Sequence, residues 1–390
     1  MNSLFPRTDR SYLARWWWTV DRGLIAAFLG LFIFGIVLVA AASPPVAERI
    51  GLDQYYFIKR HLVFAALSVV VMLAVSLFSA RNIWRLSSLV MLGCLGAMVL
   101  VLFTGVEIKG AQRWITIFGF SLQPSEFAKP AFAVCAAWLI ARQKENSAFP
   151  GGRIVAGLFV ITILLLLLQP DLGMSVVVGV IYGTVIFLAG FPMWLVGGLM
   201  IVGCAGLVGS YFAFSHVKSR FDRFFDPSGG DSYQVQKALE AFQNGGFFGT
   251  GPGQGTVKLY IPDAHADFIF AVAGEELGFL FVAILIGLFL FVLLRGLNRI
   301  MDSEDLFAVL AVGALLAMFG VQAFVHMATS VHLMPTKGMT LPFISYGGSS
   351  LLAMAYAMGM VLALTRRRGK TVIARGSAIS KKQYMTGKTR

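Results

Sequence analysis

Long apolar stretches alternate with short polar ones along most of the chain. A helix of about 17 or more apolar residues is long enough to cross the hydrocarbon core of a bilayer. The first such run is not followed by a convincing cleavage site, so we expect it to be retained rather than removed as a signal peptide. The pattern predicts ten spans, at 23–42, 61–79, 87–105, 125–142, 153–169, 172–190, 193–214, 267–294, 305–330 and 345–365.

Composition leads to the same class, an all-α integral membrane bundle. Charged residues make up 13% of the chain, against roughly a quarter in a soluble domain. The three cysteines all lie inside apolar runs and are typical of small core residues, so no disulfide framework is indicated. The histidines lack the spacing of a zinc site, and we predict no metal site in the protein itself.

Lysine and arginine orient the bundle. Most of the 32 fall on one side when both chain ends are placed in the cytoplasm, as the positive-inside rule requires. We therefore divide the chain into a cytoplasmic segment 1–22, a ten-helix domain 23–365 and a basic tail 366–390 that we expect to be disordered. An extracytoplasmic loop, 215–266, joins helices 7 and 8. The net charge of +13 follows mainly from this bias and the tail, and it favours anionic lipid headgroups over nucleic acid as the partner.

The extracytoplasmic loop has two features of its own. Residues 232–244 have mixed polarity at helical spacing, which predicts a short amphipathic helix on the membrane surface. Residues 245–255 (GGFFGTGPGQG) precede Lys258 and are rich in glycine. Glycine lets backbone N–H groups approach an anion, so this stretch either cradles a lipid-linked pyrophosphate or simply makes tight turns. It lacks a GK[ST] ending, which argues against a nucleotide-binding P-loop.

Asp267 is the strongest candidate for chemistry, because it lies where the polar segment 261–266 meets the eighth span. A carboxylate at that depth can be partly desolvated, which raises its proton affinity and suits it to act as a base. Chains that only need to cross a bilayer usually place Trp, Tyr, Lys or Arg at this depth. The alternative is that Asp267 merely caps the eighth helix.

Other ionisable residues lie within predicted spans and are functional candidates for that reason. Glu126 and Lys129 are three residues apart and share a helix face, where they form either a self-neutralising pair or part of a site. Glu275 and Glu276 are adjacent, and a structural role, in which they bond to a broken helix elsewhere, is as plausible as a catalytic one. The Pro- and Gly-rich residues 335–350 predict an irregular stretch, which would bring Lys337 close to Asp267.

Four motifs are spread over most of the chain: 110–115 (GAQRWI) with 123–126 (QPSE), 169–173 (QPDLG), the Asp267 segment with 274–278 (GEELG), and 335–338 (PTKG) through 347–350 (GGSS). Together they resemble the SEDS family, the bacterial peptidoglycan glycosyltransferases of shape, elongation, division and sporulation. The form PTKGMTLP at 335–342 resembles the division branch more than the elongation branch. Three positions before Asp267, namely Ile261, Asp263 and Ala266, depart mildly from the usual pattern of that segment, and Asp267 itself is kept.

The resemblance implies a reaction at the outer face of the bacterial inner membrane. The GlcNAc 4-hydroxyl of one lipid II molecule would attack the MurNAc C1 of a lipid-linked glycan strand, with Asp267 as the general base and undecaprenyl pyrophosphate leaving. Inversion at C1 would follow. The substrate-binding residues that we expect are Arg113, Gln123, Ser125, Glu126, Lys129, Lys258, His265, Lys337 and Ser345.

The resemblance also implies partners, namely a class B penicillin-binding protein, which supplies crosslinking, and other proteins of the division septum. No tightly bound cofactor is expected, although a divalent cation, Mg²⁺ or Mn²⁺, could accompany the substrate pyrophosphate. Two other functions remain open. A lipid II flippase would share the architecture, but we find no inverted repeat with paired broken helices. A non-catalytic division scaffold would leave Asp267 unexplained.

Overall fold

The computed structural model describes residues 11–108, 111–117, 120–213, 215–225, 230–301, 303–335 and 338–366. The chain divides into two units, a main unit of Arg22–Thr365 and a terminal unit of Met1–Asp21 with Arg366–Arg390. The terminal unit contains α1 (Tyr12–Thr19), whose N-cap Ser11 accepts a hydrogen bond from the Ala14 N–H. We expected the basic tail to be disordered. Its residues beyond Arg366 lie outside the described ones.

Ten helices of the main unit coincide with the ten predicted spans. Seven of them, α2, α3, α4, α6, α8, α11 and α12, are long and apolar enough to cross a membrane, and α7 and α13 are apolar but shorter. The tenth, α5, carries charged residues at both ends, so the count of ten spans stays a prediction. The bounds are α2 Arg22–Arg49, α3 Tyr56–Ser76, α4 Ala80–Thr104, α5 Pro124–Glu145, α6 Gly151–Leu168, α7 Leu172–Leu188, α8 Met193–Ala213, α11 Ile269–Met301, α12 Leu306–Ser330 and α13 Gly348–Leu364.

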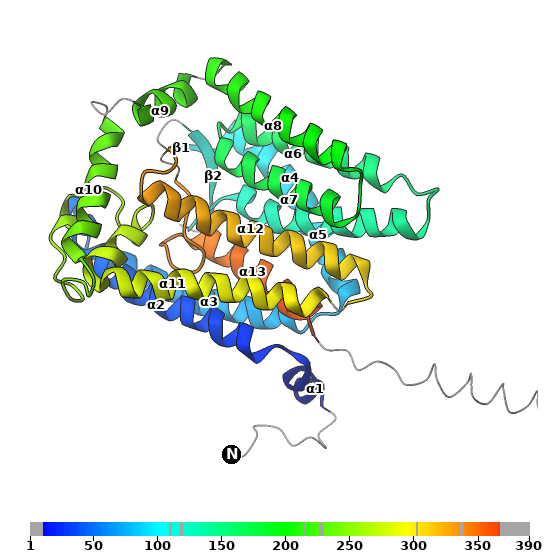
Figure 1. The fold of residues 1–390 in the computed structure, drawn as a ribbon, viewed down its shortest axis with the longest axis horizontal. Helices are drawn as coiled ribbons and strands as arrows, with labels where there is room; N and C mark the ends of the chain where they lie inside the picture. Colours follow the sequence, from blue (N-terminus) through cyan, green and yellow to red (C-terminus); the bar gives the residue numbers. More distant parts are fainter. Residues whose placement is uncertain are drawn as a thin grey trace, which may run out of the picture. The chain divides into compact units, whose positions relative to one another are not determined.

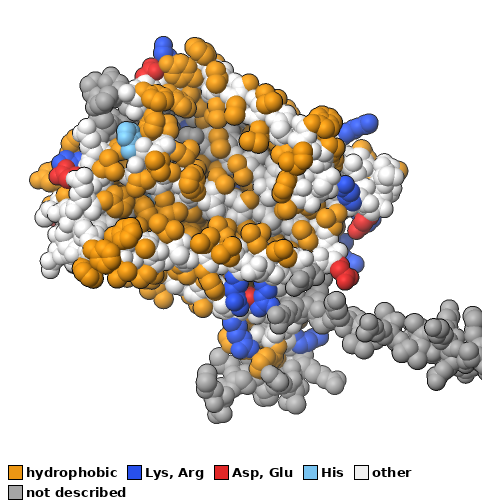
Figure 2. Space-filling view, viewed as in Figure 1, with side chains coloured by type: hydrophobic (Ala, Val, Ile, Leu, Met, Phe, Trp, Pro, Cys, Tyr) orange, Lys and Arg blue, Asp and Glu red, His pale blue; other side chains and the backbone are white. Residues whose placement is uncertain are grey.

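The core of the main unit is formed by α5, α12 and α13. Helix α12 packs against α5, α7, α11 and α13, while α13 packs most extensively on α3 (Figure 1). Nearly every residue of α13 is buried, whereas α8 buries only Ser210. Hydrophobic side chains cover the visible face of the helices, as expected of a surface that meets lipid rather than water (Figure 2).

The long connections between the helices gather at one end of the bundle, which we call the loop end. It includes a three-stranded antiparallel sheet, which the sequence did not predict, of β1 (Val106–Ile108), β2 (Ala111–Ile117) and β3 (Phe120–Leu122). It also includes α9 (Ser215–Phe225), α10 (Gly230–Gly245) and a 3₁₀ turn η1 (Val257–Tyr260). Helix α10 confirms the predicted short amphipathic helix, and it buries Val235, Ala238 and Ala241.

The stretch between α12 and α13 is irregular, as predicted, and it folds into the bundle. Phe343 takes a left-handed backbone conformation (φ 65°) and its ring lies 4.6 Å from that of Phe32 and 5.7 Å from that of Phe28. A Cβ on Gly35 would lie 2.4 Å from the Phe343 carbonyl oxygen, so only glycine lets α2 approach this closely. Non-helical backbone is tolerated at membrane depth where protein covers it in this way.

Candidate functional site

Asp267 lies in a turn that leads into α11. Its backbone N–H donates to the carbonyl of Asp263 (3.0 Å), and the carboxylate is half-buried. The helix begins at Ile269, two residues later than predicted, and the Phe268 carbonyl accepts from the Ala271 and Val272 N–H groups. Phe268 thus occupies the N-cap position, one residue beyond Asp267. Asp267 itself therefore lies one residue before the N-cap, and the choice between capping and catalysis is left to experiment.

The carboxylate of Asp267 faces the stretch between α12 and α13. A Cβ built on Gly338 would lie 3.5 Å and 3.6 Å from its two oxygens. Two motifs far apart in the sequence therefore meet at this point. Lys337, which was predicted to approach Asp267, lies outside the described residues.

His265 fastens the Asp267 turn to the rest of the bundle. Its ring is buried between Phe57 of α3, at 4.2 Å between centroids, and Tyr346, at 5.2 Å. Its carbonyl accepts a hydrogen bond from the Tyr346 N–H (3.0 Å). Ser345 has a similar internal role, because its hydroxyl accepts from the Leu341 N–H (2.8 Å). Phe57 was not recognised from the sequence, and only its position shortly before an apolar run could have suggested it.

Arg113 of β2 joins two of the motifs. Its Nε–H donates to the carbonyl of Gln169 (2.9 Å), another guanidinium N–H donates to the carbonyl of Pro170, and Nη1 lies 3.4 Å from a carboxylate oxygen of Asp171. These contacts bind the sheet to the turn between α6 and α7. All three nitrogen atoms of the guanidinium are thus directed at oxygen atoms of the protein itself.

The start of α5 carries the predicted intramembrane pair. Lys129 Nζ lies 2.9 Å from a carboxylate oxygen of Glu126, and both side chains are buried. Ser125 is also buried, and among the described residues its hydroxyl has no hydrogen-bond partner. Gln123 is the residue before α5, and its N–H donates to the hydroxyl of Ser349 in α13 (3.1 Å). The sheet, α5 and α13 are therefore tied together near these groups.

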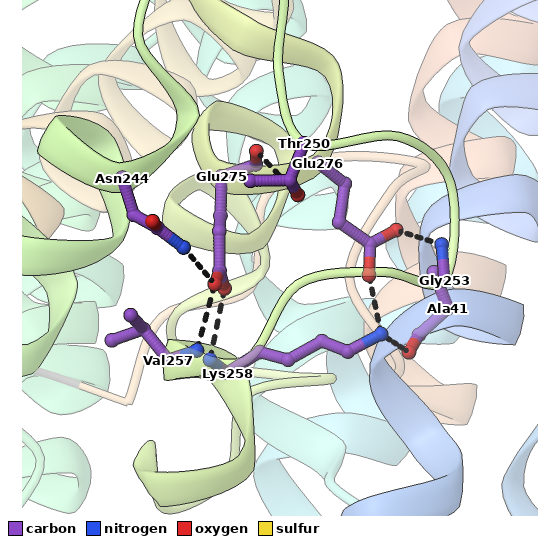
Figure 3. A network of polar contacts seen from close by, with 8 residues as sticks. All are labelled: Ala41, Asn244, Thr250, Gly253, Val257, Lys258, Glu275 and Glu276. Carbon is purple, nitrogen blue, oxygen red and sulfur yellow. Dashed lines mark hydrogen bonds and ion pairs between the residues drawn. The ribbon is translucent and has the colours of Figure 1, made fainter.

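Glu275 and Glu276 organise the glycine-rich stretch (Figure 3). The Glu275 carboxylate accepts from the backbone N–H groups of Val257 (2.7 Å) and Lys258 (2.9 Å) and from Asn244 Nδ2 (3.0 Å). The Glu276 carboxylate accepts from the Gly253 N–H (2.9 Å) and pairs with the Lys258 ammonium. Both glutamates are buried, and their contacts favour a structural role over the catalytic one, although the carboxylates bond to the loop and not to a broken helix elsewhere.

Two interpretations of this stretch change as a result. The backbone N–H of Gly253 in this stretch, and those of Val257 and Lys258 just after it, are directed at the protein's own carboxylates, which favours the turn interpretation of the glycines. Lys258, expected to bind substrate, is buried, and its ammonium donates to the Ala41 carbonyl (2.8 Å) besides pairing with Glu276. Its charge is therefore neutralised inside the protein and not presented to a ligand.

The same stretch covers a break in α11. Gly278 has a non-helical conformation (φ 76°), and a Cβ there would lie 2.3 Å from the backbone nitrogen of Gly249. The carbonyls freed at the break, of Glu275 and Glu276, accept from the N–H groups of Thr250 (2.9 Å) and Gly251 (3.0 Å). Loop and broken helix thus satisfy each other's backbone groups, as buried backbone requires.

Comparisons with known proteins agree with this architecture. The family model of the FtsW, RodA and SpoVE proteins, described as cell cycle protein, matches residues 22–370. A probable peptidoglycan glycosyltransferase FtsW of Caulobacter vibrioides is 45% identical over 365 residues, which are 93% of this chain and 94% of the relative. The corresponding protein of Trichlorobacter lovleyi is 37% identical over 352 residues, or 88% of this chain and 92% of the relative.

Solved structures show the same fold. The rod shape determining protein RodA of Thermus thermophilus is 27% identical, with a TM-score of 0.66 over 90% of this chain and 97% of that one. A chain from a peptidoglycan synthase complex, solved in a study of how polymerization and crosslinking are coordinated, has a TM-score of 0.72 and 27% identity. That match covers 89% of this chain and 97% of the other.

Proposed function

The chain belongs to the FtsW, RodA and SpoVE family of cell cycle proteins, and we propose that it is a peptidoglycan glycosyltransferase that polymerises lipid II. The observation that carries this proposal is the carboxylate of Asp267, half-buried against Gly338 where two family motifs meet. A carboxylate shielded from part of the solvent binds a proton more readily than one in water.

In the proposed reaction Asp267 is the general base. It takes the proton of the GlcNAc 4-hydroxyl while that oxygen attacks C1 of MurNAc on the lipid-linked strand. The bond from C1 to the pyrophosphate oxygen breaks, and undecaprenyl pyrophosphate leaves with the electron pair. Attack opposite the leaving group inverts C1, and the strand grows by one disaccharide.

The negative charge that develops on the leaving pyrophosphate needs stabilisation. Among the described candidates, Arg113, Lys129 and Lys258 are already paired with carboxylates. We therefore assign the main electrostatic role to Lys337, with Mg²⁺ or Mn²⁺ as an alternative. The described residues include no group of three or more His, Cys, Asp or Glu that could hold a metal. Such an ion would be carried chiefly by the phosphates, as Mg²⁺ often is.

The Lys337→Ala variant is expected to lower kcat for strand synthesis while leaving the folded yield unchanged, because it removes the cation that we assign to the leaving pyrophosphate. Turnover of lipid II by purified protein measures this, with Lys59→Ala as the matched control, since Lys59 is exposed and its ammonium pairs with the exposed Asp53. Parental turnover by the Lys337→Ala protein would reduce Lys337 to an anchor for headgroups.

The proposed site faces the outside of the bacterial inner membrane, with both chain ends in the cytoplasm and the enzyme at the division septum. In a protein whose three cysteines are replaced by alanine, an impermeant maleimide added from outside should label Gly230→Cys. It should not label Ala148→Cys, between α5 and α6. The reverse pattern would put the site on the cytoplasmic side, away from the growing wall.

Lipid II polymerisation in detergent tests the function itself. With a class B penicillin-binding protein as partner, the purified chain should convert lipid II into glycan strands. A flippase would make none, because it only moves lipid II between leaflets and detergent has no second leaflet. A division scaffold would make none either, because it catalyses no reaction. Running the assay with and without the partner also shows whether the chain is active alone.

A further inference from the structure

A histidine that the mechanism does not yet use lies in α12, close to its end. His326 is fully buried, and its Nδ1 lies 2.7 Å from the carbonyl oxygen of Met339. A carbonyl only accepts hydrogen bonds, so Nδ1 must carry the hydrogen, and in the neutral ring Nε2 is then an acceptor. Within the described part of the chain, Nε2 has no hydrogen-bond partner.

A buried histidine in this position lowers the stability of the folded protein unless its one hydrogen bond compensates. Burying a polar nitrogen without a partner is unfavourable, and a leucine or methionine would fill the space without that cost. The group that His326 serves is a backbone carbonyl in the irregular stretch between α12 and α13, where no helix or sheet supplies a donor. Buried carbonyls almost always find a partner, and here a side chain supplies it.

The carbonyl that His326 holds belongs to the neighbour of Gly338, the residue that faces Asp267. The same stretch is held on its other side by α13, through the contact between the hydroxyls of Thr340 and Ser350. Within α12 itself, the hydroxyls of Thr329 and Ser330 both donate to the His326 carbonyl (2.9 Å each), so these two contacts do not reach the stretch. The backbone beside the carboxylate is thus fixed between two helices, and His326 makes the side-chain contact from α12.

We propose that His326 is a positioning residue for Asp267. By donating from Nδ1 to the Met339 carbonyl, it holds Gly338 against the carboxylate and so fixes where that carboxylate meets the sugar hydroxyl. His326 acts through the backbone and touches neither substrate nor the reacting atoms. This inference rests on the proposed function, because the geometry that it preserves is that of the Asp267 base.

Substitutions that keep or remove one donor test this role. Asn at 326 can place its amide N–H where Nδ1 lies, whereas the amide of Gln reaches toward the position of Nε2. We expect His326→Asn to keep turnover within a few-fold of the parent. His326→Gln and His326→Leu should lose on the order of 10²-fold in kcat, the size of effect that a misplacement of about 1 Å produces, with KM for lipid II little changed. His332→Asn is the matched control, because His332 is exposed and packs on Phe224.

The measurements are kcat and KM in the detergent assay with the partner, together with the thermal midpoint Tm of each purified variant. Parental kcat for a folded His326→Leu protein would overturn the inference. If that variant does not fold, the pair of polar variants decides, and equal kcat for the Asn and Gln proteins would overturn it. Failure of the parent itself to polymerise lipid II would instead overturn the proposed function, and this inference with it.

Discussion

The Asp267→Asn protein is expected to fold, bind its partner and make almost no glycan strands. Asn keeps the size of the side chain and one acceptor oxygen, but it cannot take the proton of the sugar hydroxyl. General base catalysis typically contributes about 10²–10⁴-fold to a rate, and we expect a loss of kcat of that size. Polymerisation of lipid II by the purified variant, measured beside the parent, gives the value directly.

The matched control is Asp263→Asn in the same turn. Asp263 has a left-handed backbone (φ 51°), which Asn adopts almost as readily as Asp, and its carbonyl accepts from the N–H groups of Ala266 and Asp267 in either variant. This variant should polymerise at close to the parental rate. If Asp267 were only a helix cap, Asn would serve equally well and both variants would be active. Near-parental activity of Asp267→Asn would remove this residue from the mechanism.

The Lys258→Met variant is expected to lower the free energy of unfolding by about 3–5 kcal/mol, the usual effect of removing one partner of a buried ion pair. Methionine fills the space of the lysine stem, but Glu276 is left as a buried charge with the Gly253 N–H as its other contact. The measurement is the Tm of the purified protein in detergent, together with the folded yield.

Two further variants show whether the loss comes from the unpaired charge. Adding Glu276→Gln to Lys258→Met removes the charge but keeps an acceptor for Gly253, so this double variant should regain much of the lost Tm. Lys59→Met breaks an ion pair of 2.7 Å on the surface, where both side chains are largely exposed, and should change Tm little. Equal Tm values for Lys258→Met and the double variant would show that the unpaired charge of Glu276 does not cause the loss.

Helices at the ten predicted positions could be expected because each is a long apolar run, but their ends could not. Helix α3 begins at Tyr56 rather than 61 and α11 ends at Met301 rather than 294. Hydropathy reports the part of a helix that lies in lipid, and the polar turns that continue it carry no such signal. The sheet was missed because β1 and β3 have three residues each. Strands that short show no alternation to recognise.

The motifs identified the candidate site, but not the partners of its charged residues. Arg113 pairs with Asp171, and Lys258 with Glu276, because distant segments of the chain pack together. A lysine that binds a substrate and a lysine that pairs with a buried glutamate cannot be told apart in the sequence. The glycines of 245–255 were equally ambiguous, since close packing on α11 and phosphate binding both demand residues without a side chain.

The break at Gly278 gives α11 two parts with different attachments. The part before it, which leads back to the turn of Asp267, is bonded to the glycine-rich loop through the carbonyls of Glu275 and Glu276. The part after it continues as a membrane span to Met301. A helix transmits force best while its hydrogen-bond ladder is continuous, and here the ladder is interrupted. We therefore expect movement of the loop to reach the turn of Asp267 through these bonds, and tilting of the later part of the helix to be largely absorbed at Gly278.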